Sequence, residues 1–351
     1  MTGRAGMERK VKLAVLGAGL IGKRHIQHVL AEPQAELLAV VDPMQLGQQI
    51  AQESGAKWFP SFTAMINTDR PDGIIVATPN QIHVANGLEA IAAGVPALIE
   101  KPIADNIADG EKLIGAAQAA GIPLLVGHHR RHNPIIQKAK KIIDSGELGR
   151  VLVANAMFWL FKPDDYFNID WRRQAGAGPV FLNLIHDVDN LRYLLGDIVA
   201  VQARESHIVR SNVVEETAVI LMEFASGLLA TASVSDTVVA PWSWEMTTGE
   251  NPAYPKTEEA CYLIGGSHGS LSIPSLDVWK NGTKRSLWEP FETHRVEFEH
   301  EDPLALQIQQ FCKVIRGEEP PLVTGRDGLN TLNVIMAIKQ SADSGERIVL
   351  G

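Results

Sequence analysis

Three glycines, Gly17, Gly19 and Gly22, directly follow the hydrophobic stretch Val11–Leu16 near the start of the chain. In this pattern the first glycine permits a tight turn after a strand, and the second lets a ligand approach the backbone. The third lets the following helix pack closely on the sheet. The start of that helix, at Leu20 and Ile21, presents free N–H groups and the positive end of the helix dipole, which bind phosphate.

Asp42 ends the second hydrophobic stretch, residues 37–41. A carboxylate at this position is placed to hold the two ribose hydroxyls of an adenosine. The glycine turn, the amphipathic helix after it and this acid together predict a dinucleotide site. The competing interpretation, an ordinary glycine turn in a parallel sheet, leaves Asp42 unexplained.

Two further residues could carry proton chemistry. Lys101 stands at the end of the predicted strand 96–100, where partial burial favours a neutral amine that can accept a proton. A surface lysine paired with Glu100 is the competing interpretation. His186 and Asn183 lie three residues apart on a predicted helix and therefore share a face, where they could orient a hydroxyl. Taken alone, His186 is better explained as a structural histidine.

The basic runs are less specific. His128-His129-Arg130-Arg131-His132 could meet a phosphate or a carboxylate, or it could form structural ion pairs. We expect no metal there, because adjacent histidines at a strand end point in opposite directions and no acid or cysteine stands beside them. Trp171-Arg172 could stack on a cofactor ring and approach its phosphates, but the pair alone has no specificity.

The elements that must position these residues change character near residue 128. Before it, strands and helices alternate, which predicts a parallel sheet covered by helices on both faces, with ligands beyond the carboxyl ends of the strands. After it, long strands follow one another without helices, which predicts an open, mainly antiparallel sheet with the helix 180–195 on one face. We therefore predict a doubly wound Rossmann domain at 1–128 and an α/β domain at 129–351, with the C-terminal helices free to pack back on the first. The predicted strands of the second domain are 151–160, 199–209, 217–224, 228–239, 260–264 and 271–273; its predicted helices include 134–144, 303–314 and 327–344, and 242–255 is expected to be an irregular loop or lid.

Composition excludes several classes of function. The formal net charge of −9 argues against nucleic acid or an anionic membrane as the main partner. The two cysteines, Cys261 and Cys312, lie far apart and form no metal or redox spacing. No apolar run is long enough to span a bilayer, and the first residues lack a signal-peptide pattern, so we expect a cytoplasmic protein.

Several of these motifs recur together in one family. They are the glycine turn with Asp42, Thr78-Pro79-Asn80 followed by His83, Glu100-Lys101-Pro102, residues 127–131, Trp171-Arg172 and the helix that carries His186. In this order and at these intervals, they make the chain resemble the Gfo/Idh/MocA oxidoreductases over nearly its whole length. The resemblance implies hydride transfer between a nicotinamide and a carbon that bears a hydroxyl, and an open sheet that builds a homodimer or homotetramer.

The resemblance also implies roles for individual residues. Lys101 and His186 match the catalytic lysine and histidine. Beside what the resemblance implies, we expect Asn183 to act with them in catalysis, and we expect His129 and Asn183 to bind the substrate together with Lys101 and His186. Asp42 matches the ribose acid and favours NAD over NADP, because its charge repels a 2′-phosphate and neither Pro43 nor Met44 supplies a cation. The matched cofactor-binding positions are Gly17, Gly19, Leu20, Ile21, Gly22, Asp42, Thr78, Pro79, Asn80, His83, Glu100, Lys101, Trp171 and Arg172.

One position departs from the family pattern. Relatives commonly carry an aspartate four residues before the histidine, where this chain has Leu182. Asn183 can orient a hydroxyl but cannot accept its proton at neutral pH, which leaves Lys101 as the expected acceptor. The expected substrate is a sugar, inositol or cyclic diol, and the arginines of both basic runs are compatible with an acidic one. Two alternatives stay open: a redox-neutral lyase or glycosidase with tightly bound NAD, and a non-catalytic NAD-binding subunit.

Overall fold

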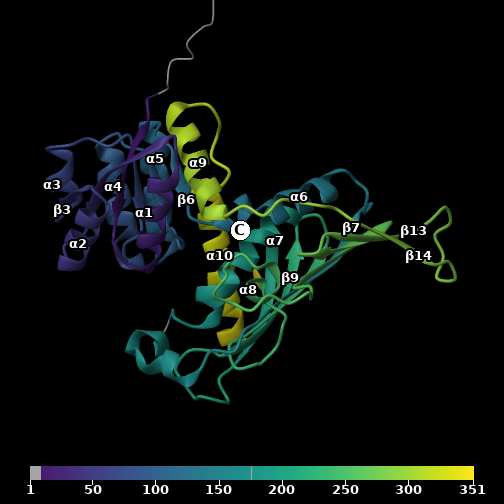
Figure 1. Cartoon of the computed structure of the whole chain (residues 1–351). Coiled ribbons are helices and arrows are strands. Elements are labelled where there is room, and N and C mark those ends of the chain that lie inside the picture. The colour runs from purple at the N-terminus through teal and green to yellow at the C-terminus, as the bar shows by residue number, and fades with distance from the viewer. Residues whose placement is uncertain (1–8, 175) are drawn as a thin grey trace, which may run out of the picture. The chain divides into compact units, whose positions relative to one another are not determined.

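Residues 9–174 and 176–351 are described by the computed structural model, and the chain divides into two units (Figure 1). The first unit consists of the described part of Met1–His132 together with Glu301–Leu332. The second consists of the described part of Asn133–His300 together with Asn333–Gly351. Each unit has its own hydrophobic core around its own sheet.

The first unit is built on a parallel sheet of six strands in the order β3-β2-β1-β4-β5-β6. The central strands are almost wholly apolar, because both faces of the sheet are covered by helices. The strand order reverses between β1 and β4, and sheets of this kind bind their ligands beyond the carboxyl ends of the strands at such a point. The strands are β1 (Val11–Leu16), β2 (Ala35–Val41), β3 (Lys57–Phe59), β4 (Gly73–Val76), β5 (Ala97–Ile99) and β6 (Leu124–Val126).

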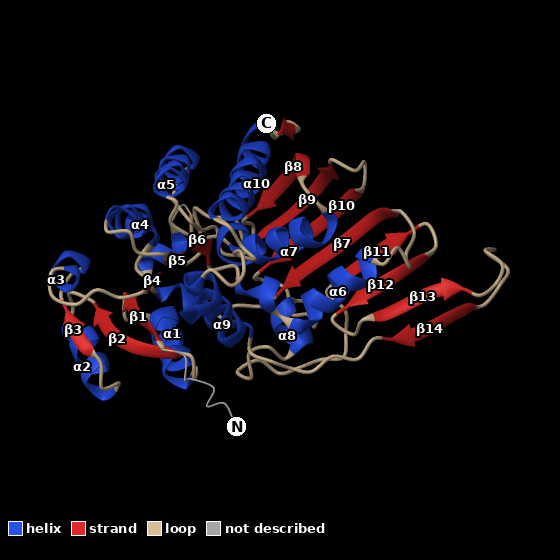
Figure 2. Cartoon of the chain, turned by 90° about the horizontal axis from the view of Figure 1, so that it is seen from above, coloured by secondary structure: helices blue, strands red, loops and turns tan. Residues whose placement is uncertain are grey.

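Two layers of helices cover this sheet. Figure 2 shows α3, α4 and α5 on one face, and α1, α2 and α9 on the other. Phe311 of α9 packs into the same core as Ile26 of α1, so a segment near the C-terminus completes the first unit. The helices are α1 (Leu20–Ala31), α2 (Gln45–Glu53), α3 (Phe62–Ile66), α4 (His83–Ala92), α5 (Ile107–Ala120) and α9 (Pro303–Arg316), with the first turns of α10 (Gly325–Ser344) and the short 3₁₀ segments η1 (Asn80–Ile82) and η2 (His129–His132).

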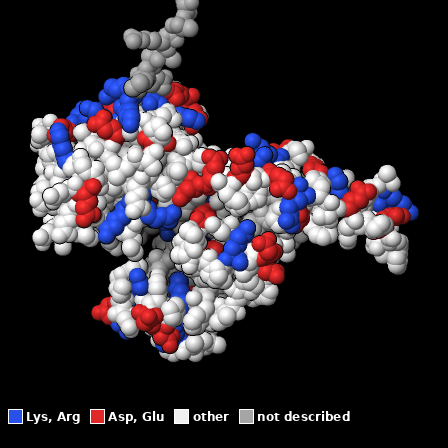
Figure 3. Space-filling view, viewed as in Figure 1, with Lys and Arg blue, Asp and Glu red and all other residues white. Residues whose placement is uncertain are grey.

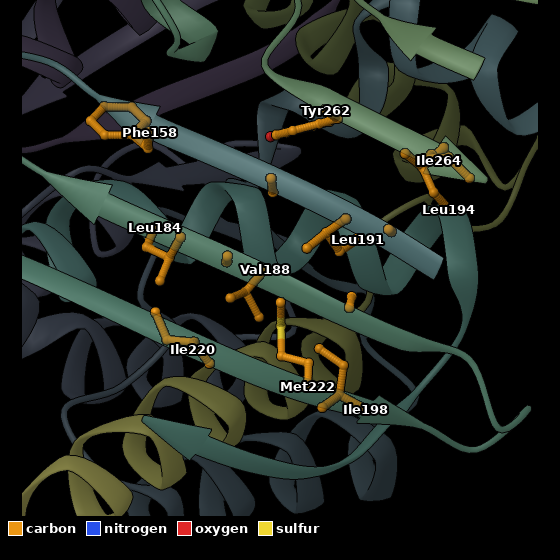
Figure 4. Close-up of a cluster of buried hydrophobic side chains, with 14 of the residues drawn as sticks. Phe158, Leu184, Val188, Leu191, Leu194, Ile198, Ile220, Met222, Tyr262 and Ile264 are labelled. Carbon is orange, nitrogen blue, oxygen red and sulfur yellow. The ribbon is translucent and has the colours of Figure 1, made fainter. Parts of the chain in front are cut away.

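The second unit contains an open sheet of nine strands in the order β14-β13-β12-β11-β7-β10-β9-β8-β15. Alternating burial along β9 shows that one face is packed and the other is not. On the packed face, Val188 and Leu191 of α7 lie against Ile220 and Met222 of β9 (Figure 4). The strands are β7 (Val151–Trp159), β8 (Ile198–Ser206), β9 (Thr217–Phe224), β10 (Leu229–Ser235), β11 (Tyr262–Gly266), β12 (Gly269–Ile273), β13 (Asp277–Asn281), β14 (Phe291–Arg295) and β15 (Ile348–Val349).

The predicted α/β class with a Rossmann sheet and a second, mainly antiparallel sheet is confirmed, with three local differences. β7 and β10 are neighbours and run parallel, so the second sheet is mixed. The helix expected at 180–195 begins with a π-turn, η5 (Val180–Leu184), before α7 (Ile185–Leu195). The expected loop 242–255 contains the short helix α8 (Trp244–Thr248), which Ser243 caps. The remaining elements are α6 (Pro134–Asp144) and the 3₁₀ segments η3 (Asp164–Asn168) and η4 (Asp170–Arg173).

Candidate functional site

The glycine turn after β1 is sterically closed to any side chain at two of its positions. Gly17 has a φ of +91°, and a Cβ there would lie 2.5 Å from the carbonyl oxygen of Ala77. A Cβ on Gly22 would lie 2.0 Å from the carbonyl oxygen of Gly17. The turn and the start of α1 are therefore held against β4 by contacts that only glycine permits.

The N-terminus of α1 is open for an anion. Gly19 is the N-cap residue, no side chain accepts a hydrogen bond from the first turn, and a Cβ on Gly19 would meet nothing within 4 Å. The apolar side chain of Leu20 is 86% exposed beside this opening. Free N–H groups in front of open space are the arrangement that binds a phosphate.

Asp42 is anchored next to this opening. One carboxylate oxygen accepts a hydrogen bond from the Ala18 N–H at 2.8 Å. The other accepts from the Met44 N–H, also at 2.8 Å. The side chain is half-buried, and each oxygen keeps a lone pair for a further donor. Open helix terminus, glycine backbone and fixed acid thus fit the phosphates and the adenosine ribose of NAD.

His83 supports the loops that follow β4 and β5. It is 1% exposed, and its ring nitrogens lie 2.9 Å from the Thr78 carbonyl oxygen and 2.8 Å from the Pro102 carbonyl oxygen. The hydroxyl of Thr78 in turn donates to the Asn86 side-chain oxygen at 3.1 Å. Both ring nitrogens of His83 are therefore engaged with the backbone, and its predicted contact with the cofactor stays a prediction.

Glu100 connects the end of β5 to helix α1. Its carboxylate accepts a hydrogen bond of 2.6 Å from His25 of α1, and the second oxygen accepts from the Lys101 N–H at 3.2 Å. Burial alone would raise the pKa of Glu100, but the hydrogen bond and charge of His25 outweigh it and lower the pKa to about 2. A Cβ on Gly127 would lie 2.9 Å from this carboxylate, so the next strand end also needs glycine. Lys101, the next residue in the chain after the ionised Glu100, is half-buried.

We expect this ion pair to make stability depend on pH. The Glu100 pKa is lowered from 4.5 to about 2, so its contribution is fully present above about pH 4.5 and is lost as the pH falls through 2. The shift corresponds to about 3 kcal/mol of unfolding free energy. Glu100→Gln should remove that part of the pH dependence in urea unfolding followed by tryptophan fluorescence, whereas Glu53→Gln, on the exposed surface of α2, should keep it. If the unfolding free energy of Glu100→Gln fell below pH 4.5 as it does in the wild type, this assignment would be contradicted.

The basic run after β6 is mostly internal. Arg131 is 3% exposed, and its guanidinium lies 3.3 Å from the carboxylate of Asp327 in α10. Arg131 is therefore a buried ion-pair partner of Asp327. This contact favours a structural role for Arg131 over substrate binding. His129 is half-buried, and its charge contributes to lowering the pKa of Glu100. It therefore belongs to the same strand-end group as Lys101.

In the second unit, the predicted residues gather at the π-turn and the start of α7. His186 is 9% exposed, and Asn183 is half-buried on the π-turn. The next residue, Asp187, accepts a short hydrogen bond from the Tyr262 hydroxyl of β11 and is wholly buried. The π-turn changes the spacing on which the shared α-helical face of Asn183 and His186 was predicted.

One residue of this group is not apparent from the sequence pattern. Lys162, in the loop after β7, donates a hydrogen bond of 2.8 Å to the Asn183 side-chain oxygen. Its ammonium also lies 3.6 Å from the carboxylate of Asp236, which follows β10. Burial lowers the pKa of Lys162, and the charge of Asp236 opposes this change. No motif marks Lys162, because its partners lie far away in the sequence.

The Trp171-Arg172 pair lies in the 3₁₀ segment η4. Trp171 is 53% exposed, so its ring is accessible. Arg172 stacks on the Tyr166 ring at 3.9 Å and donates a hydrogen bond of 2.8 Å to the Tyr166 carbonyl. Part of the donor capacity of Arg172 is thus used within its own loop, and its predicted role toward the cofactor stays a prediction.

The structure brings together one group of predicted residues in each unit. In the first, the glycine turn, Asp42, the loop of Thr78, and Glu100 with Lys101 are joined through backbone contacts and hydrogen bonds. Within the described residues, no cluster of three or more histidine, cysteine or acidic side chains could hold a metal ion. None of the helices described is both long and apolar enough to cross a membrane.

The first unit also has a hollow that lies apart from this group of residues. It has a volume of about 520 Å³ and is lined by Arg9, Arg70, Asp72, Pro96 and Arg316. Asp72 and Pro96 precede β4 and β5, so the hollow lies at the amino ends of the strands. Ligands of such sheets bind at the other edge, where the glycine turn lies.

The fold and the glycine turn define a dinucleotide-binding protein of the Rossmann class. Comparison with known proteins gives the family: residues 11–128 match the model described as "Oxidoreductase family, NAD-binding Rossmann fold", and residues 136–272 match the GFO/IDH/MocA C-terminal domain. The chain belongs to the Gfo/Idh/MocA family of NAD-dependent oxidoreductases, as the sequence motifs predicted.

Individual relatives cover almost the whole chain. It is 27% identical to scyllo-inositol 2-dehydrogenase (NAD(+)) of Bacillus subtilis (strain 168), over 98% of this chain and 97% of that protein. It is 25% identical to 1-carboxy-3-chloro-3,4-dihydroxycyclo hexa-1,5-diene dehydrogenase of Comamonas testosteroni, over 93% and 94%. Among solved structures, the WlbA dehydrogenase from Bordetella pertussis in complex with NADH and UDP-GlcNAcA has a TM-score of 0.78 at 25% identity, covering 98% of this chain and 99% of that one.

Proposed function

We propose that this NAD-dependent enzyme oxidises a secondary alcohol of a sugar, an inositol or a cyclic diol. The observation that carries the proposal is the link between the phosphate-binding helix and the proton-accepting position. His25 of α1 binds Glu100, and Lys101 follows directly. The names of the inositol and carboxylated cyclic-diol dehydrogenases among its relatives support this substrate class.

In the proposed reaction, the bound NAD supplies the acceptor for the hydride. The backbone N–H groups at the start of α1 hold its phosphates, and Asp42 accepts hydrogen bonds from its ribose. The amine of Lys101 takes the proton from the substrate hydroxyl. His186 and Asn183 hold substrate hydroxyls, and Leu182 offers no group that could replace Lys101 as the proton acceptor.

The test is an NAD reduction assay at 340 nm over sugars, polyols and cyclic diol acids, preceded by a thermal-shift screen with NAD present. Turnover of at least one such alcohol supports the proposal. NAD that copurifies without exchanging, with product formed but no net NADH, would favour the redox-neutral alternative instead. Stabilisation by NAD without turnover anywhere in the panel would favour the non-catalytic alternative.

Asp42 should determine the choice of cofactor. In Asp42→Ser, loss of the carboxylate removes both the ribose contact and the repulsion of a 2′-phosphate. We expect NADH to bind about tenfold more weakly, equal to about 1.4 kcal/mol, and NADPH to bind more tightly than to the wild type. Fluorescence titration with both nucleotides measures this, and Glu89→Gln on the exposed surface of α4 is the control. An unchanged ratio of the two affinities would argue against the ribose assignment.

We further propose that the open face of the second sheet joins copies of this chain into a dimer or tetramer. Val153, Leu221, Leu263 and Trp279 are each between 39% and 56% exposed on this face. Exposed apolar side chains that come from several strands of one sheet face are typical of an interface. On the face seen in Figure 3, acidic and basic side chains are interspersed, which fits small-molecule chemistry better than a nucleic-acid partner. Light scattering should give the mass of two or four chains of 38.2 kDa each.

A further inference from the structure

We propose that Lys162 fixes the orientation of the Asn183 side-chain amide and leaves its NH₂ group as the available donor. The enzyme then selects substrates that place an accepting oxygen, such as that of a carboxylate, at this position. The inference rests on the proposed dehydrogenase function and names a substrate class for it. The residue that determines the selection is a lysine with no counterpart among the sequence motifs.

The parallel pairing of β7 with β10 places Lys162 beside Asp236. β7 and β10 run in the same direction, so the segments after their carboxyl ends lie together. The Lys162 N–H donates to the Asp236 carbonyl at 2.8 Å. Arg210 strengthens this junction, because it donates to the Asp236 carboxylate at 2.7 Å and to the Lys162 carbonyl, also at 2.7 Å. The side chains of Lys162 and Asp236 are 11% and 3% exposed, so the lysine is held in place.

The chemistry of an ammonium group then fixes the orientation of the Asn183 amide. An ammonium only donates, so the Asn183 atom 2.8 Å from the Lys162 nitrogen must be the oxygen. The amide NH₂ group consequently points away from Lys162. It has no hydrogen-bond partner within residues 9–174 and 176–351, and Asn183 is half-buried. The group available at this position is therefore a donor.

A donor at this position selects differently from a carboxylate. A carboxylate accepts a proton from a substrate hydroxyl, whereas the Asn183 NH₂ group must find an accepting oxygen. When a bound substrate displaces water from this half-buried donor, a donor left without a partner is unfavourable, so a substrate that lacks such an oxygen is disfavoured. The nearby charge of Lys162 favours a carboxylate among the accepting groups.

The test uses matched probes that differ in one group, D-glucose against D-glucuronate and D-galactose against D-galacturonate. Binding to the NADH-loaded protein is measured by calorimetry, so that no turnover is needed. We expect the wild type to bind at least one uronate about tenfold more tightly than its matched hexose. Lys162→Met should abolish this preference and leave NADH binding unchanged. Lys284→Met, which removes an ammonium from a side chain that is 74% exposed, should keep the preference.

Asn183→Asp is the second variant, because it keeps the size of the side chain and replaces the donor by an acceptor. It should lose the preference for uronates even if Lys162→Met fails to fold. Equal binding of hexose and uronate by the wild type, no binding of any uronate, or a preference that survives both variants would overturn the proposal. In each of these cases, retained NADH binding together with turnover of any alcohol leaves the proposed dehydrogenase function standing.

Discussion

Lys101→Met is expected to reduce kcat/KM for the alcohol substrate by about 10²–10⁴-fold, the usual contribution of a positioned proton acceptor. Methionine has a similar length but no basic nitrogen, so the hydroxyl proton would have no acceptor at position 101. The backbone N–H of Lys101 would still donate to Glu100, and the glycine turn would be untouched. NADH affinity should therefore remain at the wild-type value.

The assay for this variant combines steady-state kinetics with NADH fluorescence titration. Lys112→Met, on the exposed surface of α5, is the matched control and should behave as the wild type. Wild-type turnover by Lys101→Met would remove the lysine from the mechanism. Loss of NADH binding together with activity would instead assign Lys101 to the cofactor site.

Gly22→Ala is expected to have the largest effect on the first unit. The added Cβ would lie 2.0 Å from the Gly17 carbonyl oxygen, a backbone atom that cannot rotate away. Forcing α1 from the sheet should reduce the unfolding free energy by about 3 kcal/mol. NADH binding should be lost as well, because the same displacement moves the phosphate-binding N-terminus.

Gly115→Ala in the same unit is the control, and it should raise the unfolding free energy instead of lowering it. Gly115 lies in α5, and a Cβ there would meet nothing within 4 Å. Alanine in an open helical position should stabilise by about 0.5–1 kcal/mol. Urea unfolding and NADH titration of both variants measure these effects. Equal stability of Gly22→Ala and Gly115→Ala would contradict the close packing of α1 that the turn requires.

The first unit could be predicted well because its signals are local. A tight turn, a helix start and a strand end are each set by a few adjacent residues, such as Gly17, Gly22 and Asp42. The strand boundaries predicted for this unit differ from the observed ones by only a few residues; β5, for example, is Ala97–Ile99 within the predicted strand 96–100.

The second unit was harder because its features depend on distant pairing. β13, β14 and β15 were not predicted, since β14 is exposed along its whole length and β15 has only two residues. The parallel pairing of β7 with β10 is set by the topology of the sheet, so the meeting of Lys162 with Asp236 has no local signal. The π-turn likewise follows from tertiary packing and leaves no periodicity that separates it from an α-helix.

The contact of His25 with Glu100 has a consequence for anyone who wishes to re-engineer this enzyme. The helix that we propose holds the nucleotide phosphates and the segment that carries the Lys101 amine are joined by this buried hydrogen-bonded pair. We therefore expect a chimera that takes the segment of α1 from a protein without this histidine to lose the position of the Lys101 amine, even if Lys101 itself is retained. Grafts should transfer the two segments together.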